Sequence, residues 1–177
     1  HLGTDETDFK DKLFVPEMVE HVRSLGKKAI AWNPGWPFKS KEVDLLHLWS
    51  SKGRIVYGTP AIDSRYHYLN HYDLFADIQM LYSSKVLGVT ASNTNVMGAI
   101  LAVWNDRYVE SPRTIMQENA VYPNMLALAE RAWLGGGAGY FNAPTAALSP
   151  EASPETREAF VDFERRLLWH KDRVFAS

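Results

Sequence analysis

A chain of 177 residues with an apolar fraction of 46% is long enough for one domain with a substantial hydrophobic core. Its net charge of −2, with acids and bases mixed along the chain, argues against a nucleic-acid partner, which would require a basic face. The sequence contains no cysteine, which excludes disulfides and thiolate metal sites but leaves the compartment open, and no apolar run has the length of a membrane span.

The chain opens with a segment, residues 1–7, in which two adjacent acids follow a small-residue turn. If Leu2 ends a β-strand, Asp5 and Glu6 stand at its carboxyl end, where α/β proteins place their ligands. Adjacent residues on an extended chain point to opposite sides, so the two carboxylates would have different roles. The alternative is that the two acids begin a helix, where they would complement its dipole.

Short apolar segments alternate with helical patterns through the first two thirds of the chain. Residues 14–25 have the apolar spacing of a helix, and Gly26 is a typical helix stop. A short helix is expected at residues 74–81. Four apolar segments are expected to form strands: residues 28–32, 43–49, 54–58 and 98–104. The last of these is the strongest, and its continuous apolar run predicts burial on both faces, as in a parallel sheet.

Two longer helices are expected toward the end of the chain. Residues 114–134 show a long helical pattern that ends at the glycines of residues 135–137. A second helix should begin at Pro154, with Ser153 as its N-cap, and continue to about Phe175. Its apolar stripe must pack on another element and consists of Phe160, Phe163, Leu167 and Val174. This alternation of strands and helices favours βαβ units and a parallel sheet.

Several of the expected strands end in an aromatic residue, namely Trp32, Trp49 and Trp104. In a β/α barrel, the residues just past the strand ends line one mouth, so a single pocket with three tryptophans and several carboxylates is expected. Aromatic faces suit the apolar side of a sugar ring, and paired carboxylates suit glycoside hydrolysis. Each of these tryptophans could instead be a core residue, and Trp133 and Trp169, inside helices, are expected to be packing residues.

Other candidate sites in the sequence are weaker. His67 and His71 are four residues apart and could bind a metal on a helix, but no acid lies nearby at ligand spacing. A nucleophilic role for Ser64 or Ser92 has no supporting glycine elbow. We therefore expect no metal site.

The first six residues, His-Leu-Gly-Thr-Asp-Glu, resemble the His-x-Gly-Gly-Asp-Glu signature of family 20 glycoside hydrolases, the β-N-acetylhexosaminidases and their relatives. Further landmarks of that family follow in the family's order. They are Trp32 and Trp49 after the next strands, Tyr68-Leu69-Asn70 for a Tyr-Leu-Asp motif, Trp104-Asn105-Asp106 for a Trp-x-Glu motif, and residues 127–133 for the closing helix.

The resemblance implies an α/β fold, the C-terminal half of a (β/α)8 TIM barrel from about strand 4 to strand 8. Residues 1–140 would form this half of the catalytic barrel, and residues 141–177 a C-terminal loop and helix packing on it. A full barrel takes about 250 residues, so the first strands would precede His1. A chain with half a barrel is expected to be inactive alone, to expose sheet edges, and to aggregate or form a dimer.

The resemblance also implies a substrate-assisted retaining mechanism on β-linked N-acetylhexosamine in glycans, without metal or cofactor. The residue matching Glu6 is the general acid and base, and the residue matching Asp5 orients the acetamido group. Tyr68 donates to the acetamido oxygen. The remaining positions are substrate-binding: Trp32, Trp49 and Trp104 as walls, and Asp106 and Asn70 for hydroxyls.

Three residues depart from the family pattern. Thr4 replaces a glycine and Asp106 replaces a glutamate, and both features are similar to the lacto-N-biosidase branch, which releases a disaccharide. Asn70 replaces an aspartate that binds a sugar hydroxyl. The alternatives left open are disaccharide release and a non-catalytic carbohydrate-binding or structural role. A secreted, periplasmic or cell-surface location in a bacterium is the expectation for such a protein.

Overall fold

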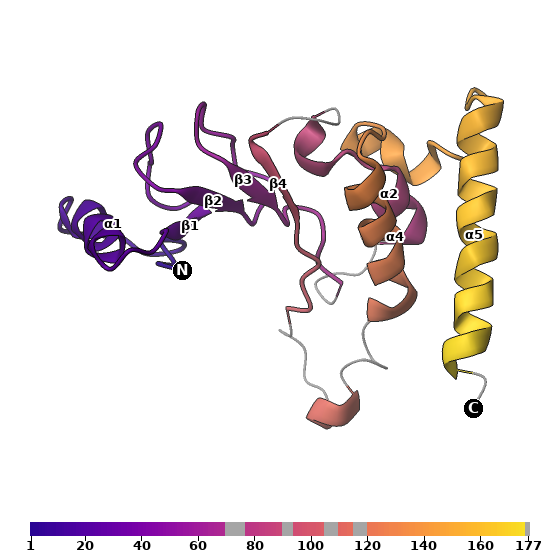
Figure 1. The fold of residues 1–177 in the computed structure, drawn as a ribbon, viewed down its shortest axis with the longest axis horizontal. Coiled ribbons are helices and arrows are strands. Elements are labelled where there is room, and N and C mark those ends of the chain that lie inside the picture. Colours follow the sequence, from indigo (N-terminus) through magenta and orange to yellow (C-terminus); the bar gives the residue numbers. More distant parts are fainter. Residues whose placement is uncertain (70–76, 90–93, 105–109, 115–119, 176–177) are drawn as a thin grey trace. The chain divides into compact units, whose positions relative to one another are not determined.

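A computed structural model describes residues 1–69, 77–89, 94–104, 110–114 and 120–175, which form two compact units. The first unit comprises His1–His67 and Ser92–Ala102, and the second comprises Tyr68–Ala91 and Val103–Ser177. The fold is mixed α/β, as the sequence predicts (Figure 1). None of the helices in the described ranges is both long and apolar enough to cross a membrane.

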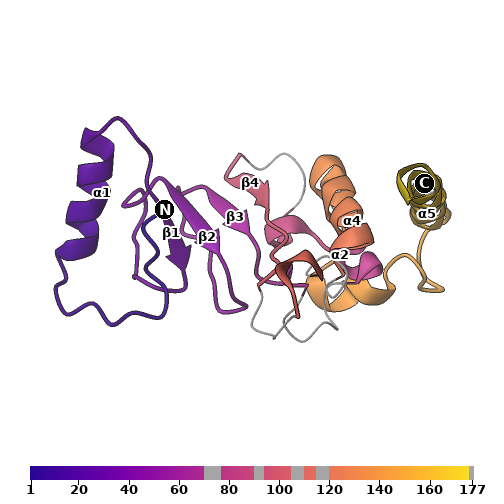
Figure 2. The ribbon, with the colours of Figure 1, turned by 90° about the horizontal axis from the view of Figure 1, so that it is seen from below.

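The first unit is built around a four-stranded sheet in which all neighbours are parallel. Its elements are α1 (Phe14–Ser24), β1 (Ile30–Asn33), β2 (Leu45–Leu48), β3 (Ala61–Asp63) and β4 (Val96–Ala99). The strands lie side by side in sequence order, β1-β2-β3-β4, with α1 beside the β1 end of the sheet (Figure 2). Because the strands are parallel, their carboxyl ends share one edge, and residues that follow different strands are brought together there.

The helix predicted at residues 14–25 and the strand predicted at 43–49 are confirmed with slightly narrower bounds. The strand predicted at 28–32 is confirmed with shifted bounds, since β1 starts two residues later and ends one residue later. Helix α1 buries Val15 and Val19 and is tied to the start of β2 by Arg23, whose guanidinium bonds both carboxylate oxygens of Asp44. The buried core around these elements consists of Val15, Val19, Ala29, Ala31, Phe38, Val43, Leu46, Leu48 and Ala61.

The prediction of a strand at residues 54–58 is wrong, because the third strand of the sheet is β3, at Ala61–Asp63. Residues 54–58 form a loop in which Gly58 has a φ of 76° and Tyr57 is 92% exposed. Pairing with β2 begins at Pro60, whose carbonyl accepts a hydrogen bond from the Leu46 N–H at 2.9 Å. Proline has no N–H to donate, so the first position of a strand is one that it can occupy.

The strand predicted at residues 98–104 is only partly correct, because β4 starts two residues earlier and ends at Ala99. Gly98 has a φ of 134°, and the register between β3 and β4 shifts at this level. The expected burial on both faces is also wrong, since Ile100 and Trp104 are 38% and 54% exposed. This strand is the last of the sheet, so its apolar residues are not enclosed as those of a central strand would be.

The second unit is helical. Its elements are α2 (Ile78–Ser83), η1 (Val86–Gly88), η2 (Pro112–Thr114), α4 (Val121–Leu134), η3 (Tyr140–Thr145) and α5 (Pro154–Phe175). Helix α2 packs against α4 and η3. Residues 74–76 of the short helix predicted at 74–81 lie outside the described residues, and the rest is found in α2, which Asp77 caps by accepting from the Met80 N–H at 2.7 Å. The helix predicted at 114–134 is found from Val121, and residues 115–119 lie outside the described residues.

Both predicted helix ends in this unit are confirmed. Helix α4 stops at Gly135, where φ is 66°, a backbone conformation that favours glycine. Helix α5 begins at Pro154, and the Ser153 hydroxyl accepts from the Thr156 N–H at 3.2 Å. Two members of its predicted apolar stripe, Phe160 and Phe163, are buried against the ring of Tyr82 on α2, with ring centroids 5.2 and 4.8 Å apart.

Helix α5 is tied to α4 by polar contacts as well. Arg166 forms a two-pronged ion pair with Glu130, and His170 stacks on Tyr122. The expectation that Trp133 and Trp169 are packing residues is wrong, since they are 89% and 60% exposed. Both lie on the sides of their helices that face away from the packed layer between α2, α4 and α5.

Candidate functional site

The first residues of the chain lie along β1. The Leu2 N–H donates to the Ile30 carbonyl and the Trp32 N–H donates to the Gly3 carbonyl, both at 2.8 Å. No strand is assigned to residues 1–3, but these two bonds hold them beside β1 as a neighbouring strand would be held. The chain leaves the sheet at Gly3, where φ is 76°.

Thr4 fastens this exit to the carboxyl end of β1. Its side-chain hydroxyl donates to the Trp32 carbonyl at 3.1 Å, and the residue is buried. The Thr4 carbonyl lies so close to Gly35 that a Cβ at Gly35 would overlap it. Thr4 has a φ of 89°, which is strained for a β-branched residue, so the surrounding contacts hold it there.

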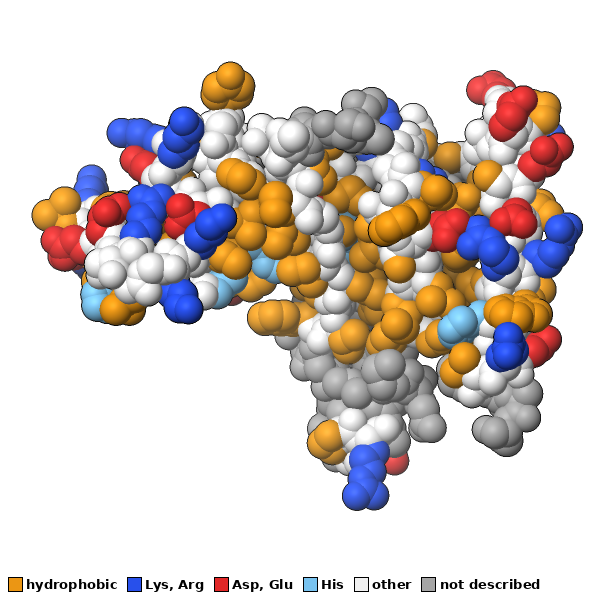
Figure 3. Space-filling model, viewed as in Figure 1, with side chains coloured by type: hydrophobic (Ala, Val, Ile, Leu, Met, Phe, Trp, Pro, Cys, Tyr) orange, Lys and Arg blue, Asp and Glu red, His pale blue; other side chains and the backbone are white. Residues whose placement is uncertain are grey.

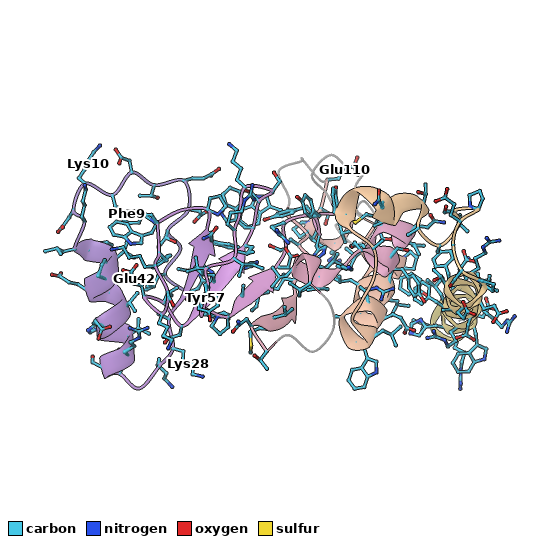
Figure 4. All side chains as sticks on the ribbon, turned by 90° about the horizontal axis from the view of Figure 1, so that it is seen from above. Phe9, Lys10, Lys28, Glu42, Tyr57 and Glu110 are labelled. Carbon is cyan, nitrogen blue, oxygen red and sulfur yellow. The ribbon has the colours of Figure 1, made fainter. Side chains whose placement is uncertain are left out.

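Asp5 and Glu6 therefore stand just beyond the carboxyl end of β1, and the alternative that they begin a helix is wrong, because α1 starts at Phe14. Asp5 is half-buried and Glu6 is exposed, with a φ of 47°. The loop that follows is held near the start of α1 by Phe9, which Figure 4 labels. Its ring stacks on Phe14 at 5.9 Å between centroids.

Four rings gather at the same edge of the sheet, from His1, Trp32, His47 and Trp49, and we call them the aromatic cluster. The Trp32 ring is its centre, with centroids 4.7 Å from His1, 4.0 Å from His47 and 6.5 Å from Trp49. Trp32 and His47 are register partners on β1 and β2, which explains their contact. The Trp49 indole N–H donates to the Pro34 carbonyl at 2.8 Å and so fixes its ring. Trp32 and Trp49 are both half-buried and present part of their rings to solvent.

His47 of the aromatic cluster forms a buried polar pair with Ser64. The His47 Nε2 and Ser64 Oγ atoms are 2.8 Å apart, and Ser64 Oγ also donates to the Leu48 carbonyl at 3.2 Å. Because the Ser64 hydroxyl donates its proton to the Leu48 carbonyl, the Ser64 oxygen accepts a hydrogen bond from the Nε2–H of His47. Burial lowers the pKa of His47 below its usual value, although the charge of Asp63 acts in the opposite direction. The ring under Trp32 is therefore a neutral imidazole near pH 7.

Asp63, the last residue of β3, holds a second polar group at this edge. Its carboxylate accepts from Arg65 Nε at 2.9 Å and from Arg65 Nη2 at 3.1 Å. Burial acts to raise the pKa of Asp63, but the Arg65 hydrogen bond and the positive charges of His67 and Arg65 outweigh it, so that pKa lies below its usual value. His67 is buried with Nδ1 3.1 Å from the Asp63 carbonyl, and desolvation lowers its pKa.

The predicted site residues therefore fall into three groups. Asp5, Glu6, Trp32 and Trp49 lie at the carboxyl edge of the sheet in the first unit. Tyr68, which is half-buried, and Trp104, which is exposed, belong to the second unit, and Trp104 lies five residues past β4 rather than at its end. The other positions, Asn70 and Asp106, lie outside the described residues, as do His71 and Ser92.

The sequence prediction did not include His47, Asp63 or Arg65 in the site. A usable signal was present for His47, because it is a polar residue inside a short apolar strand that the sequence predicts, whereas Asp63 ends β3, which the sequence did not predict. Such residues need a hydrogen-bonding partner within the fold. Across the described residues, no three His, Asp or Glu side chains gather closely enough to hold a metal ion.

Chemically, this edge combines half-buried aromatic faces with two carboxylates on an adjoining loop. Such a surface can stack against the apolar face of a small polar molecule and exchange hydrogen bonds or a proton with its edge. No family model, curated protein or solved structure matches the chain. The fold and this edge define an α/β protein whose polar and aromatic side chains gather at the carboxyl ends of a parallel sheet.

Proposed function

We propose that this chain is the site-bearing part of a glycoside hydrolase that releases β-linked N-acetylhexosamine from glycans by substrate-assisted catalysis. The observation that carries the proposal is the hydrogen bond from Thr4 to the Trp32 carbonyl. It joins the segment with the two acids to the strand with the central tryptophan, which are the first two landmarks of the sequence resemblance.

In this proposal, Glu6 protonates the leaving oxygen and then activates water. Asp5 accepts a hydrogen bond from the acetamido N–H and stabilises the positive charge that develops on the oxazolinium ring. The two carboxylates have different surroundings, since Asp5 is half-buried and Glu6 is exposed. Trp32 and Trp49 would wall the acetamido group, and the sequence resemblance assigns further sugar-binding roles to Tyr68, Asn70, Trp104 and Asp106.

We also propose the finer fold, the C-terminal half of a (β/α)8 barrel. Four parallel strands in sequence order, without a reversal, are what a segment of such a barrel requires. The gathering of the acids and tryptophans at the carboxyl edge is the arrangement in which barrels place their sites. The connections from β1 to β2 and from β2 to β3 are loops, whereas in a regular (β/α)8 barrel a helix follows each strand.

The test is hydrolysis of aryl β-N-acetylglucosaminides and β-N-acetylgalactosaminides by the full-length protein, with the 177-residue chain assayed beside it. Replacing Glu6→Gln should slow hydrolysis about 10²- to 10⁴-fold for a poor leaving group and much less for a good one, because only the former needs the acid. Glu17→Gln, an exposed acid on α1, is the matched control and should not change the rate. An oxazoline or thiazoline mimic should inhibit. Equal rates for the wild type and Glu6→Gln would reject the proposal.

A second candidate is a carbohydrate-binding protein without turnover. It is favoured by the exposure of Glu6, because a general acid normally works in an enclosed site. Binding of N-acetylglucosamine, lost in Trp32→Ala, without hydrolysis of any aryl glycoside would select this candidate. Release of a disaccharide in place of a monosaccharide would instead select the lacto-N-biosidase-like reaction, for which Thr4 and Asp106 are the sequence evidence.

A further inference from the structure

The outer face of helix α5 carries exposed apolar side chains. One side of this helix is buried by Phe160 and Phe163 against Tyr82. Val161 and Leu168 are seven residues apart, so they lie on one line along the helix, on the side away from those phenylalanines. They are 49% and 58% exposed, and Trp169 beside them is 60% exposed.

The charges of α5 are divided between its two halves. Residues 154–164 carry four acids and one base, and residues 165–175 carry four bases and one acid. Figure 3 shows acidic side chains over the N-terminal end of α5, at the top of the view, and basic ones over its middle and lower part. Two such helices side by side attract when they run antiparallel and repel when they run parallel.

Consider two α5 helices, one from each copy, that run antiparallel with a two-fold axis between Glu164 and Arg165. In this arrangement, the side chains that lie opposite each other along this face are complementary. Val161 of each copy lies opposite Leu168 of the other, so apolar residues meet apolar residues. Glu164 lies opposite Arg165 of the other copy, and Glu158 opposite Lys171. Isologous contacts of this kind are what a two-fold symmetric dimer requires, and opposite charges beside an apolar seam determine partner and direction in paired helices.

The charges that this pairing uses are available for it. Within the described parts of the chain, none of Glu158, Glu164, Arg165 and Lys171 takes part in an ion pair, and all four are exposed. By contrast, Arg166 on the side of the helix is already bound to Glu130 and Asp162. The outer face thus combines unused charges with unburied apolar surface.

We infer that two copies of this chain associate through their α5 helices, antiparallel and related by a two-fold axis between Glu164 and Arg165. The inference is independent of the proposed enzymatic activity, because it uses none of the proposed site residues. A helix of 22 residues is about 33 Å long. A single seam of this length gives a small interface, so the dimer should be weak, with a dissociation constant on the order of micromolar or above.

Sedimentation velocity or light scattering of the 177-residue chain, over about 1 μM to 1 mM, tests the inference. The wild type should pass from monomer to dimer, and Leu168→Glu should weaken the association at least about tenfold. Leu148→Glu is the matched control, since Leu148 is similarly exposed but outside α5, and it should leave the association unchanged. A wild type that stays monomeric throughout, or equal effects of the two variants, would overturn the inference.

A charge exchange tests the direction of the pair. Glu164→Arg alone, or Arg165→Glu alone, places like charges opposite each other and should weaken the dimer. The double variant E164R/R165E restores opposite charges across the axis and should recover the wild-type association. If the double variant were as weak as the single ones, the antiparallel arrangement would be rejected. Circular dichroism of each variant verifies that the helices are retained.

Discussion

The Thr4 hydroxyl donates a 3.1 Å hydrogen bond to the Trp32 carbonyl, and this bond joins the loop that carries Asp5 and Glu6 to the end of β1. Thr4 keeps this position despite a φ of 89°. The hydrogen bond and the strain oppose each other, and both are of the order of 1 kcal/mol.

The balance at Thr4 can be measured by two substitutions. Thr4→Val preserves the shape but loses the hydroxyl, so it should lower the free energy of unfolding by about 1 kcal/mol. Thr4→Gly loses the same bond but relieves the strain of the positive φ, so it should be close to neutral. Urea unfolding of the chain measures both. A valine variant as stable as the wild type would show that the hydroxyl does not hold the loop, and a valine variant as stable as the glycine variant would show that the positive φ costs nothing.

Gly35 is the next point at which the loop can be tested. A Cβ at this position would overlap the Thr4 carbonyl oxygen, a backbone atom that cannot rotate away. Gly35→Ala should therefore destabilise the chain by about 1–3 kcal/mol. Gly139→Ala is the control, because a Cβ there meets no atom within 4 Å and should change stability by less than about 0.5 kcal/mol. Similar unfolding curves for the two variants would contradict the close approach of Gly35 and Thr4.

The buried His47 makes stability depend on pH. Its pKa in the folded chain is lowered by burial, so below about pH 6.5 the unfolded chain binds a proton at this position that the folded chain does not. The free energy of unfolding should therefore fall as the pH is lowered from about 6.5, until the pH reaches the lower pKa of the folded state. His67, also buried, contributes in the same direction.

His47→Gln should remove part of that fall between about pH 6.5 and pH 5, because the glutamine cannot titrate. Unfolding free energies at a series of pH values provide the measurement. An identical slope in the wild type and His47→Gln would mean that His47 titrates alike in the folded and unfolded chains.

The ion pair of Asp63 and Arg65 should be sensitive to the loss of one member. Asp63→Asn leaves the Arg65 charge largely buried without its partner, which in proteins costs about 3–5 kcal/mol. Asp8→Asn, which breaks the fully exposed pair with Lys10, should cost between about 0 and 1 kcal/mol. The contribution of this pair to the free energy of unfolding should also fall as the pH drops below about 4. At such pH the unfolded chain takes up a proton at Asp63 that the folded chain, with its lower pKa, does not. Equal losses in the two variants would contradict the burial of the Asp63 pair.

Local patterns predicted the helices well. The stop at Gly26, the stop at Gly135 and the start at Ser153-Pro154 are all found, because capping and glycine conformation depend on residues close together in the chain. The strands were predicted less well. Residues 54–58 are as apolar as β3, and only their pairing with neighbours distinguishes the two segments.

The sequence by itself determined the class of the fold, the ends of the helices, and the candidate acids and tryptophans Asp5, Glu6, Trp32 and Trp49. These follow from residue type, periodicity and motif, which are properties of short stretches. The tertiary structure alone decided that Thr4 bonds Trp32, that His47 lies under Trp32 at 4.0 Å, and that Asp63 is paired with Arg65 in a buried position. It also decided that Trp133 and Trp169 face solvent. The physical reason is that strand register and helix packing set these contacts, and both depend on residues far apart in the chain.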